Sequence, residues 1–114
     1  MDIRFQGRGP DTNAALSAHA RRRLEFRLMH RKNDVAYIAV KLGDTGSRRG
    51  QQDSYCVVRV QLRGLPAATV VEVGGDAYAT IDRGVDRVGR LVEAQLNGAG
   101  AGKRNSTWMR ELAA

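Results

Sequence analysis

Two hydrophobic spacings alternate along the chain and predict four strands and two helices. Apolar residues occupy every second position, the period of a half-buried strand, in residues 3–6, 35–42, 56–62 and 69–73. Elsewhere they recur every three or four positions, which places them on one face of a helix. The two helical stripes are Leu16, Ala20, Leu24 and Leu28, and then Ile81, Val85, Val88, Val92 and Leu96. The order β-α-β-β-β-α, without a repeat, predicts the α+β fold class.

The segments between these elements have the composition of turns, caps and loops. Thr12 is expected to cap the first helix and Asp76 the second. Residues 43–54 hold three glycines and no apolar side chain, so they are expected to form a loop. Short connections among the last three strands predict an antiparallel meander, and the first two strands should run parallel through a right-handed crossover. We therefore expect a four-stranded mixed sheet with both helices packed on one face.

Phe26 and Arg27 do not fit the apolar stripe of the first helix. On an ideal helix Phe26 points away from Leu24 and Leu28, whereas Arg27 falls inside their arc. Two explanations are open. Either the helix bends near residue 25, or Arg27 carries its charge to water while its aliphatic stem covers the core.

The charge of the chain indicates an anionic partner. Its 114 residues form one domain and carry 19 Lys and Arg against 12 Asp and Glu, a net charge of +7. All of this excess lies in residues 1–63. Such a balance is typical of proteins that bind nucleic acid. Sixteen of the basic residues are arginines, which suit phosphate recognition, although a GC-rich genome favours Arg over Lys in the same way.

Candidate groups for catalysis or metal binding are few. Cys56 is in phase with the buried side of its strand, where cysteine behaves as a small hydrophobe. His19 and His30 are eleven positions apart, too far to share one metal ion. The glycine clusters match no phosphate-binding motif. We expect no enzyme activity, no metal, no cofactor and no small-molecule substrate.

Cysteine content and apolar runs bear on the compartment. A single cysteine excludes an internal disulfide framework and suits a reducing cytosol. No apolar run has the length of a signal peptide or a membrane span. We therefore expect a cytoplasmic protein without a membrane partner.

Basic residues concentrate in the polar loop and on the two predicted helices, the first of which is expected to extend through Arg31 and Lys32. Helices that lie side by side would display these cations as one positive surface, suited to the phosphates and 2′-hydroxyls of structured RNA. The candidate RNA-binding residues are Arg22, Arg23, Arg27, Arg48, Arg49, Arg83, Arg87 and Arg90. Asp82 and Asp86, beside the arginines of the second helix, are expected to pair with them along that helix.

Residues 97–114 are expected to form a Gly-rich linker and a flexible tail behind a domain of residues 1–96. The tail contains Trp108 and is too short to hold a helix alone. It is either a disordered end or a docking handle for a partner or a second copy.

The predicted final helix, residues 76–96, resembles that of the ribosome hibernation-promoting factor family. In that family the helix typically reads D-x-Y-x-A-I-D followed by D-[KR]-x-x-R. The matching residues are Asp76, Tyr78, Ile81, Asp82, Asp86, Arg87 and Arg90, with Thr80 where alanine is usual. The likeness covers residues 1–96 and corresponds to the short form, because residues 97–114 lack the C-terminal dimerisation domain of long members.

The resemblance implies a dsRBD-like fold and a ribosome-associated, non-enzymatic translation inhibitor that acts in stress or stationary phase. Members bind the small ribosomal subunit, occupy its mRNA and tRNA channel, and contact rRNA phosphates through helix cations. By this likeness Arg87 and Arg90 match basic positions of the last helix, and Arg23 and Arg27 lie where the first helix is commonly basic. A monomer or a weak dimer is expected.

The second helix departs from the family in being less basic, with three arginines against four acidic residues. This difference is compatible with weaker RNA binding or with adaptation to a protein partner. The alternative hypothesis is therefore a protein-interaction module of the same fold, which docks through its tail or polar loop and binds no ribosome.

Overall fold

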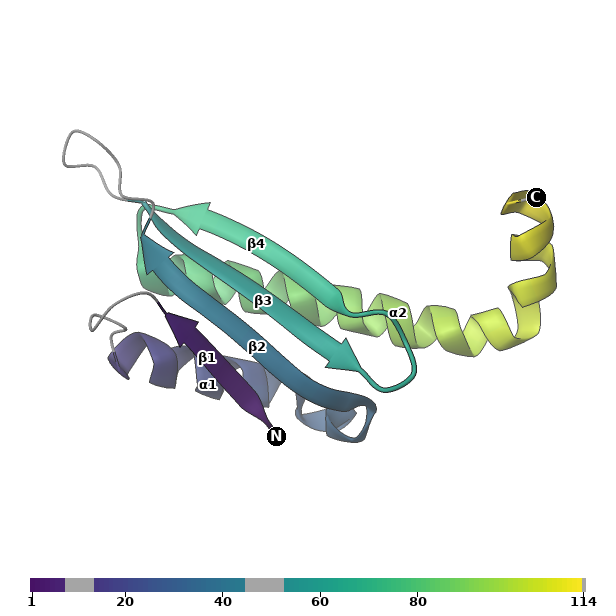
Figure 1. The fold of residues 1–114 in the computed structure, drawn as a ribbon, viewed down its shortest axis with the longest axis horizontal. Helices are drawn as coiled ribbons and strands as arrows, with labels where there is room; N and C mark the ends of the chain where they lie inside the picture. The colour runs from purple at the N-terminus through teal and green to yellow at the C-terminus, as the bar shows by residue number, and fades with distance from the viewer. Residues whose placement is uncertain (8–13, 45–52, 114) are drawn as a thin grey trace.

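The computed structural model contains one four-stranded sheet, and its elements follow the expected order (Figure 1). It describes residues 1–7, 14–44 and 53–113, with the side chains of residues 1–6, 14–44 and 53–98. The elements are β1 (Ile3–Gly7), α1 (Ala14–Leu28), the 3₁₀ helix η1 (Met29–Asp34), β2 (Val35–Asp44), β3 (Ser54–Leu62), β4 (Ala68–Gly74) and α2 (Ala77–Ala113). The α+β class and the β-α-β-β-β-α order are confirmed.

The sheet is mixed and has the strand order β1-β2-β3-β4. β1 runs parallel to β2, with Phe5 opposite Val40, and β2, β3 and β4 form the expected antiparallel meander. The turn between β3 and β4 contains Gly64 at φ +72°, a left-handed conformation that glycine adopts without steric cost. β1 and β4 are therefore the two edges of the described sheet.

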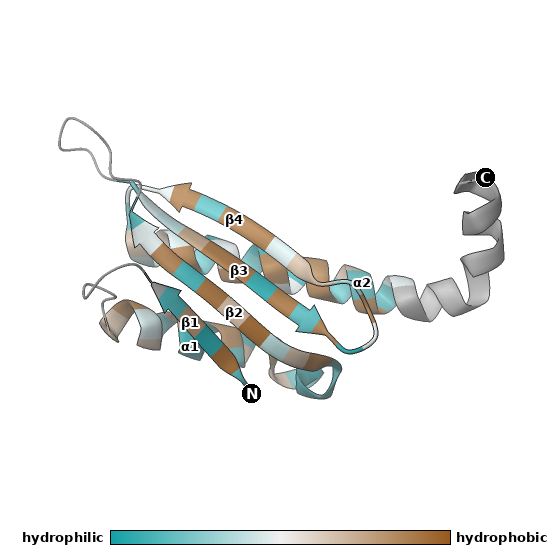
Figure 2. Ribbon diagram, viewed as in Figure 1, coloured by the Kyte–Doolittle hydropathy of each residue, from teal (hydrophilic) through white to brown (hydrophobic). Residues whose placement is uncertain are grey.

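Both helices cover the same face of the sheet, as Figure 1 shows, and the core lies between these two layers. Buried residues alternate with more exposed ones along β2 and β3, and Figure 2 shows this as alternating hydrophobic and hydrophilic bands. The buried strand residues include Ile38, Val40, Leu42, Cys56, Val58, Val60 and Leu62. The helices bury their expected stripes against them, including Leu24, Leu28, Ile81, Val85, Val88 and Val92. Each such side chain stabilises the fold by about 1.5–3 kcal/mol when it leaves water.

Several element boundaries differ from the expected ones. α1 ends at Leu28, so Arg31 and Lys32 lie on the 3₁₀ helix η1 and not on the first α-helix. A 3₁₀ turn is common at the C-terminal end of a helix, and the residues Asn33 and Asp34 that end this one are weak helix formers. β2 and β3 also extend further into the expected loop than the hydrophobic pattern indicated.

Helix α2 continues to Ala113, through the residues for which a linker and a tail were expected. The division into a domain of residues 1–96 and a separate tail stays a prediction. The expected cap Thr12 and the loop arginines Arg48 and Arg49 lie outside the described residues.

Candidate nucleic-acid interface

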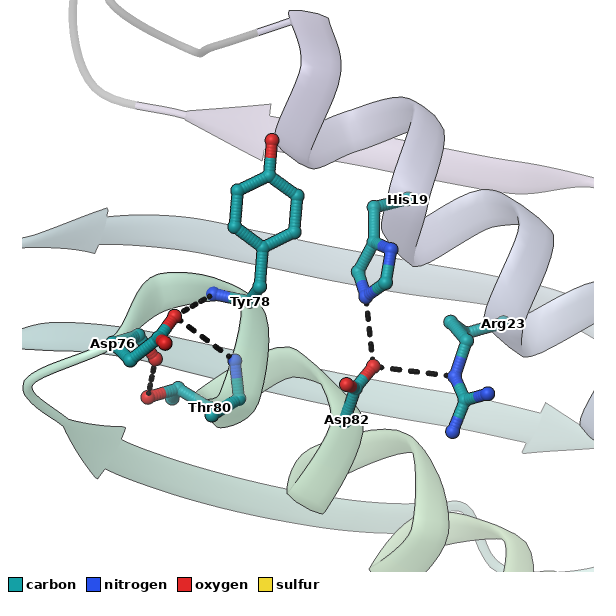
Figure 3. Close-up of polar contacts among 7 residues, drawn as sticks. His19, Arg23, Asp76, Tyr78, Thr80 and Asp82 are labelled. Atoms are coloured by element: carbon teal, nitrogen blue, oxygen red, sulfur yellow. Dashed lines mark hydrogen bonds and ion pairs between the residues drawn. The ribbon is translucent and has the colours of Figure 1, made fainter.

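The two helices lie side by side, and a row of oppositely charged side chains joins them. At one end of the row, Asp82 of α2 accepts a hydrogen bond from His19 Nε2 at 2.7 Å and pairs with Arg23 Nε at 3.2 Å (Figure 3). The His19 ring also meets the ring of Tyr78 edge-on, with the centroids 5.0 Å apart. These contacts join segments 63 residues apart in the sequence and fix α1 against α2.

Asp86 lies in the middle of the row, and an arginine from each helix approaches it. Arg27 Nε of α1 is 3.8 Å from its Oδ1, and Arg90 of α2 donates to its Oδ2. The Arg27 side chain crosses Gly89 so closely that a β-carbon on that residue would lie 2.5 Å from Arg27 Nε. Glycine at this position therefore allows the close approach of Arg27 to α2.

The course of Arg27 resolves the misfit in the first helix. α1 is one continuous helix through residue 25, and its outward Phe26 and partly buried Arg27 agree with the second explanation. Arg27 lays its aliphatic stem between the helices and carries its charge to Asp86. Phe26 points outward and is 76% exposed.

Glu93 ends the row and accepts hydrogen bonds from two side chains. Arg31 donates to its two oxygens at 3.0 and 2.8 Å, and His30 Nε2 donates to Oε1 at 2.7 Å. The hydrogen bonds from Arg31 and then His30 lower the pKa of Glu93 to about 2, and the bond to Glu93 raises the pKa of Arg31. We call this row the charge seam, made of His19, Arg23, Arg27, His30, Arg31, Asp82, Asp86 and Glu93.

Arg83 and Arg87 lie on the opposite flank of α2, against the edge strand β4. Arg87 donates to the Val71 carbonyl at 3.2 Å and pairs with Glu72 at 3.2 Å. Arg83 donates to the Val73 carbonyl at 3.4 Å. Both guanidiniums thus bind backbone carbonyls of an edge strand, where unpaired carbonyls invite pairing with another chain.

The described candidate arginines therefore divide into one free residue and several engaged ones. The side chain of Arg22 makes no hydrogen bond or ion pair within the described part of the chain, whereas those of Arg23, Arg27, Arg83, Arg87 and Arg90 each do. The engaged side chains stay accessible, from 29% exposed for Arg27 to 67% for Arg90. The helices lie side by side as expected, but acidic residues run between their cations, and Arg83 and Arg87 lie apart on the β4 flank. The expected pairing within α2 is right for Asp86 with Arg90 and wrong for Asp82, which pairs with α1.

The motif of the second helix acts largely in helix capping and packing. Asp76 caps α2, since its Oδ1 accepts hydrogen bonds from the backbone N–H of Tyr78 and Ala79 at 2.9 and 3.3 Å (Figure 3). Tyr78 contacts His19, Ile81 is buried in the core, and Asp82 binds α1. These motif positions attach the helix to the rest of the domain.

Cys56 is a core residue, as its strand phase predicted. It is 1% exposed, and burial, with the Glu72 charge as a smaller cause, raises the pKa of its thiol to about 12. At neutral pH the group is therefore an uncharged thiol, which is a poor nucleophile. Within the described residues, no three His, Cys, Asp or Glu side chains gather as metal ligands, and no described helix is long and apolar enough to cross a membrane.

The outward position of Phe26 was predicted from the sequence, whereas the cross-helix partners were not. The signal for the charge seam was present: His19, Arg23, Arg27 and Arg31 recur every four residues, as do Asp82 and Asp86. Two stripes of opposite charge on neighbouring helices can pair across their contact. The pattern could not show that these two stripes face each other.

Two solved structures are similar to this chain. The N-terminal domain of Protein Y from Thermus thermophilus has 26% identity and a TM-score of 0.60, and the match covers 81% of this chain and 96% of that domain. A ribosomal subunit interface protein from Coxiella burnetii has 21% identity and a TM-score of 0.61, with 89% of this chain and 99% of that chain covered. The Coxiella likeness shows the shared fold. No family model and no curated protein matches the chain. Both structures agree with the resemblance to the ribosome hibernation-promoting factor family.

Proposed function

We propose that this chain is a ribosome-associated, non-enzymatic translation inhibitor of the cytosol. It binds rRNA of the small subunit and blocks the channel for mRNA and tRNA, in the manner of hibernation factors in stress or stationary phase. The observation that carries the proposal is the likeness to the Protein Y domain over 81% of this chain. The related fold of a protein described as lying at the ribosomal subunit interface adds support.

The proposed RNA-contact surface is the outer side of the helix layer. Guanidinium groups there can bind phosphates by charge, and a rigid pair of helices can match the shape of folded RNA without reading its bases. The proposed contact residues are Arg22, Arg23, Arg27, Arg83, Arg87 and Arg90, together with Arg48 and Arg49 on charge alone.

The charge seam is compatible with this role. Exposed ion pairs contribute about 0–1 kcal/mol, so a phosphate can compete with the seam carboxylates for the same guanidinium. Each arginine also has five N–H donors, and Asp82 or Asp86 engages only part of them. Arg23 and Arg90 remain 51% and 67% exposed, which leaves donors directed to solvent. The seam therefore orients cations without neutralising the whole surface.

Co-sedimentation with purified small ribosomal subunits over a range of salt concentrations tests the proposal. We expect the bound fraction to fall steeply with salt, because each neutralised phosphate contributes about 0.7–0.9 to the slope of log affinity against log salt. The double variant Arg87→Glu with Arg90→Glu should be released from the subunits. Subunits that already carry mRNA and tRNA should bind less of the wild-type chain.

A charge-matched control uses the opposite face of the sheet. Lys41 and Arg59 are exposed there, on strand positions that alternate with buried ones. The variant Lys41→Glu with Arg59→Glu changes the net charge by the same amount and should still sediment with the subunits. If both variants lose subunit binding equally, net charge alone explains the loss. If the Arg87/Arg90 variant still sediments with the subunits, these two arginines do not form the binding site. Circular dichroism verifies that both variants are folded.

A further inference from the structure

An exposed aromatic side chain lies among the cations of the outer helix surface. Phe26 is 76% exposed and Met29, three residues later, is 58% exposed. Both lie on the side of α1 and η1 away from the core, where a protein helix usually carries polar residues. Exposing a phenyl ring to water gives up the stabilisation of its burial, so the ring at this position contributes nothing to the core.

The ring borders a groove with a positive rim. The groove has a volume of about 340 Å³ and is lined by Met1, Arg22, Glu25, Phe26, Met29 and Lys32. Arg22 precedes Phe26 by one helical turn, and Lys32 follows it on η1. Within the described residues, neither charged side-chain group makes an ion pair or a hydrogen bond, in contrast to the arginines of the charge seam. The groove therefore combines an apolar floor with two uncompensated cations and one carboxylate.

We propose that this groove binds an unpaired nucleotide of RNA, with its base stacked on Phe26 and its flanking phosphates held by Arg22 and Lys32. The inference rests on the proposed function and deepens it, because it adds a single-stranded segment to a surface otherwise suited to phosphates. Every base has a flat π-face that stacks on an aromatic ring, and sequence-tolerant binding of single strands combines such stacking with cations along the backbone. Sites that bind single-stranded RNA often place an arginine beside the aromatic ring on which a base stacks.

The charge of the rim favours RNA over a second copy of this chain. A second copy would bring its own Arg22 and Lys32 toward the same groove, because a symmetric contact uses the same patch twice. Two free cations would then face two free cations across an apolar contact. A polyanion with flat, apolar bases satisfies both the ring and the rim.

Fluorescence-anisotropy titration of the full chain with a labelled oligouridylate tests the stacking, against an abasic ribose-phosphate oligomer of the same length. Phe26→Ala should weaken binding of the oligouridylate about five- to 150-fold, the range for the loss of one stacked base. It should leave binding of the abasic oligomer unchanged. Because Phe26 is exposed, the variant is expected to retain the fold and its melting temperature.

Two further variants separate stacking from a merely apolar contact. Phe26→Trp should retain the affinity for the oligouridylate, and Phe26→Leu should lose it to the same extent as Phe26→Ala. Equal binding by the leucine and tryptophan variants would overturn the proposal, as would equal effects of Phe26→Ala on the two oligomers. Loss of self-association in Phe26→Ala would assign the groove to a second copy instead.

Small-subunit sedimentation distinguishes failure here from failure of the proposed function. A Phe26 effect on the oligouridylate, without any binding of subunits by the wild-type chain, would contradict only the ribosomal role. Subunit binding without a Phe26 effect would contradict only the stacking.

Discussion

Neighbouring arginines on α1 meet different surroundings. Arg22 borders the outer groove and has no ion-pair partner within the described residues, whereas Arg23 lies in the charge seam and pairs with Asp82 at 3.2 Å. Both are exposed residues of one Arg-Arg-Arg run. Adjacent positions of a helix point in different directions. One arginine can therefore face the neighbouring helix while the next faces solvent. Cations counted along a sequence therefore divide into those that hold the fold and those that are available to a ligand.

The free energy of unfolding should depend more on the residues of the charge seam than on those of the outer groove. Gly89→Ala places a methyl group 2.5 Å from Arg27 Nε and 2.8 Å from its Cγ, which forces Arg27 out of the contact. Arg27 is flexible and partly exposed, so it can move aside at the cost of its contacts with Asp86 and between the helices. This loss offsets the roughly 1 kcal/mol that alanine gains over glycine in a helix. We expect little net change in the free energy of unfolding, measured by urea denaturation.

Gly98 provides a matched control on the same helix. A β-carbon there meets nothing within 4 Å, so Gly98→Ala should raise the free energy of unfolding by up to about 1 kcal/mol. In an Arg27→Ala background, Gly89→Ala should recover the gain of up to about 1 kcal/mol that Gly98→Ala shows. If Gly89→Ala has the same small effect with and without Arg27, the close contact does not offset that gain.

The seam also shows which features the sequence could predict. The strand alternation, the stripe from Ile81 to Val92 and the Asp76 cap each depend on local spacing, and all were predicted. The partners of Asp82 and Glu93 lie on another helix, and their identity depends on the rotation of α1 about its axis. Arg27 appeared as a misfit because a charged residue lies in the buried arc of Leu24 and Leu28, while its partner Asp86 belongs to the other helix.

The free surface was less predictable than the seam for a related reason. Arg22 and Arg23 are equivalent in composition and charge, and only their contacts separate them. The sequence did indicate that Phe26 is exposed, because an aromatic residue outside the apolar stripe of its helix has no partner in the core. Its neighbour Lys32 could not be assigned to the same groove, since α1 was expected to continue where η1 begins.

Charge reversal of the two neighbouring arginines tests the division directly. Arg23→Glu places a carboxylate against Asp82 and should lower the free energy of unfolding by up to about 1 kcal/mol, a modest value because the pair is half exposed. Arg22→Glu should leave stability within about 0.5 kcal/mol and reduce the salt slope of oligouridylate binding by about 0.7. Urea denaturation and anisotropy titration measure the two quantities. Identical behaviour of the two variants in both assays would contradict the division.

The smallest expected effect concerns Glu93, at the end of the charge seam. The Arg31 and His30 hydrogen bonds lower the pKa of Glu93 from 4.5 to about 2 in the folded chain. A carboxylate whose pKa is lower in the folded state stabilises that state above its unfolded pKa, and this contribution is lost as the pH falls through the folded value. Wild type should therefore be more stable than Glu93→Gln at neutral pH, and the difference should narrow below pH 4.5 and close near pH 2.

Urea midpoints of wild type and Glu93→Gln, measured at intervals from pH 7 to pH 2, follow this difference. Glu25→Gln is the matched control, because Glu25 lines the outer groove and makes no ion pair within the described residues. Its midpoint should stay close to that of wild type throughout. The effect should be modest, since Arg31 and Glu93 are 31% and 26% exposed and solvent screens their attraction. A Glu93→Gln difference that persists unchanged at pH 2 would mean that the ionised carboxylate is not what joins η1 to α2, and that the seam ends at Asp86.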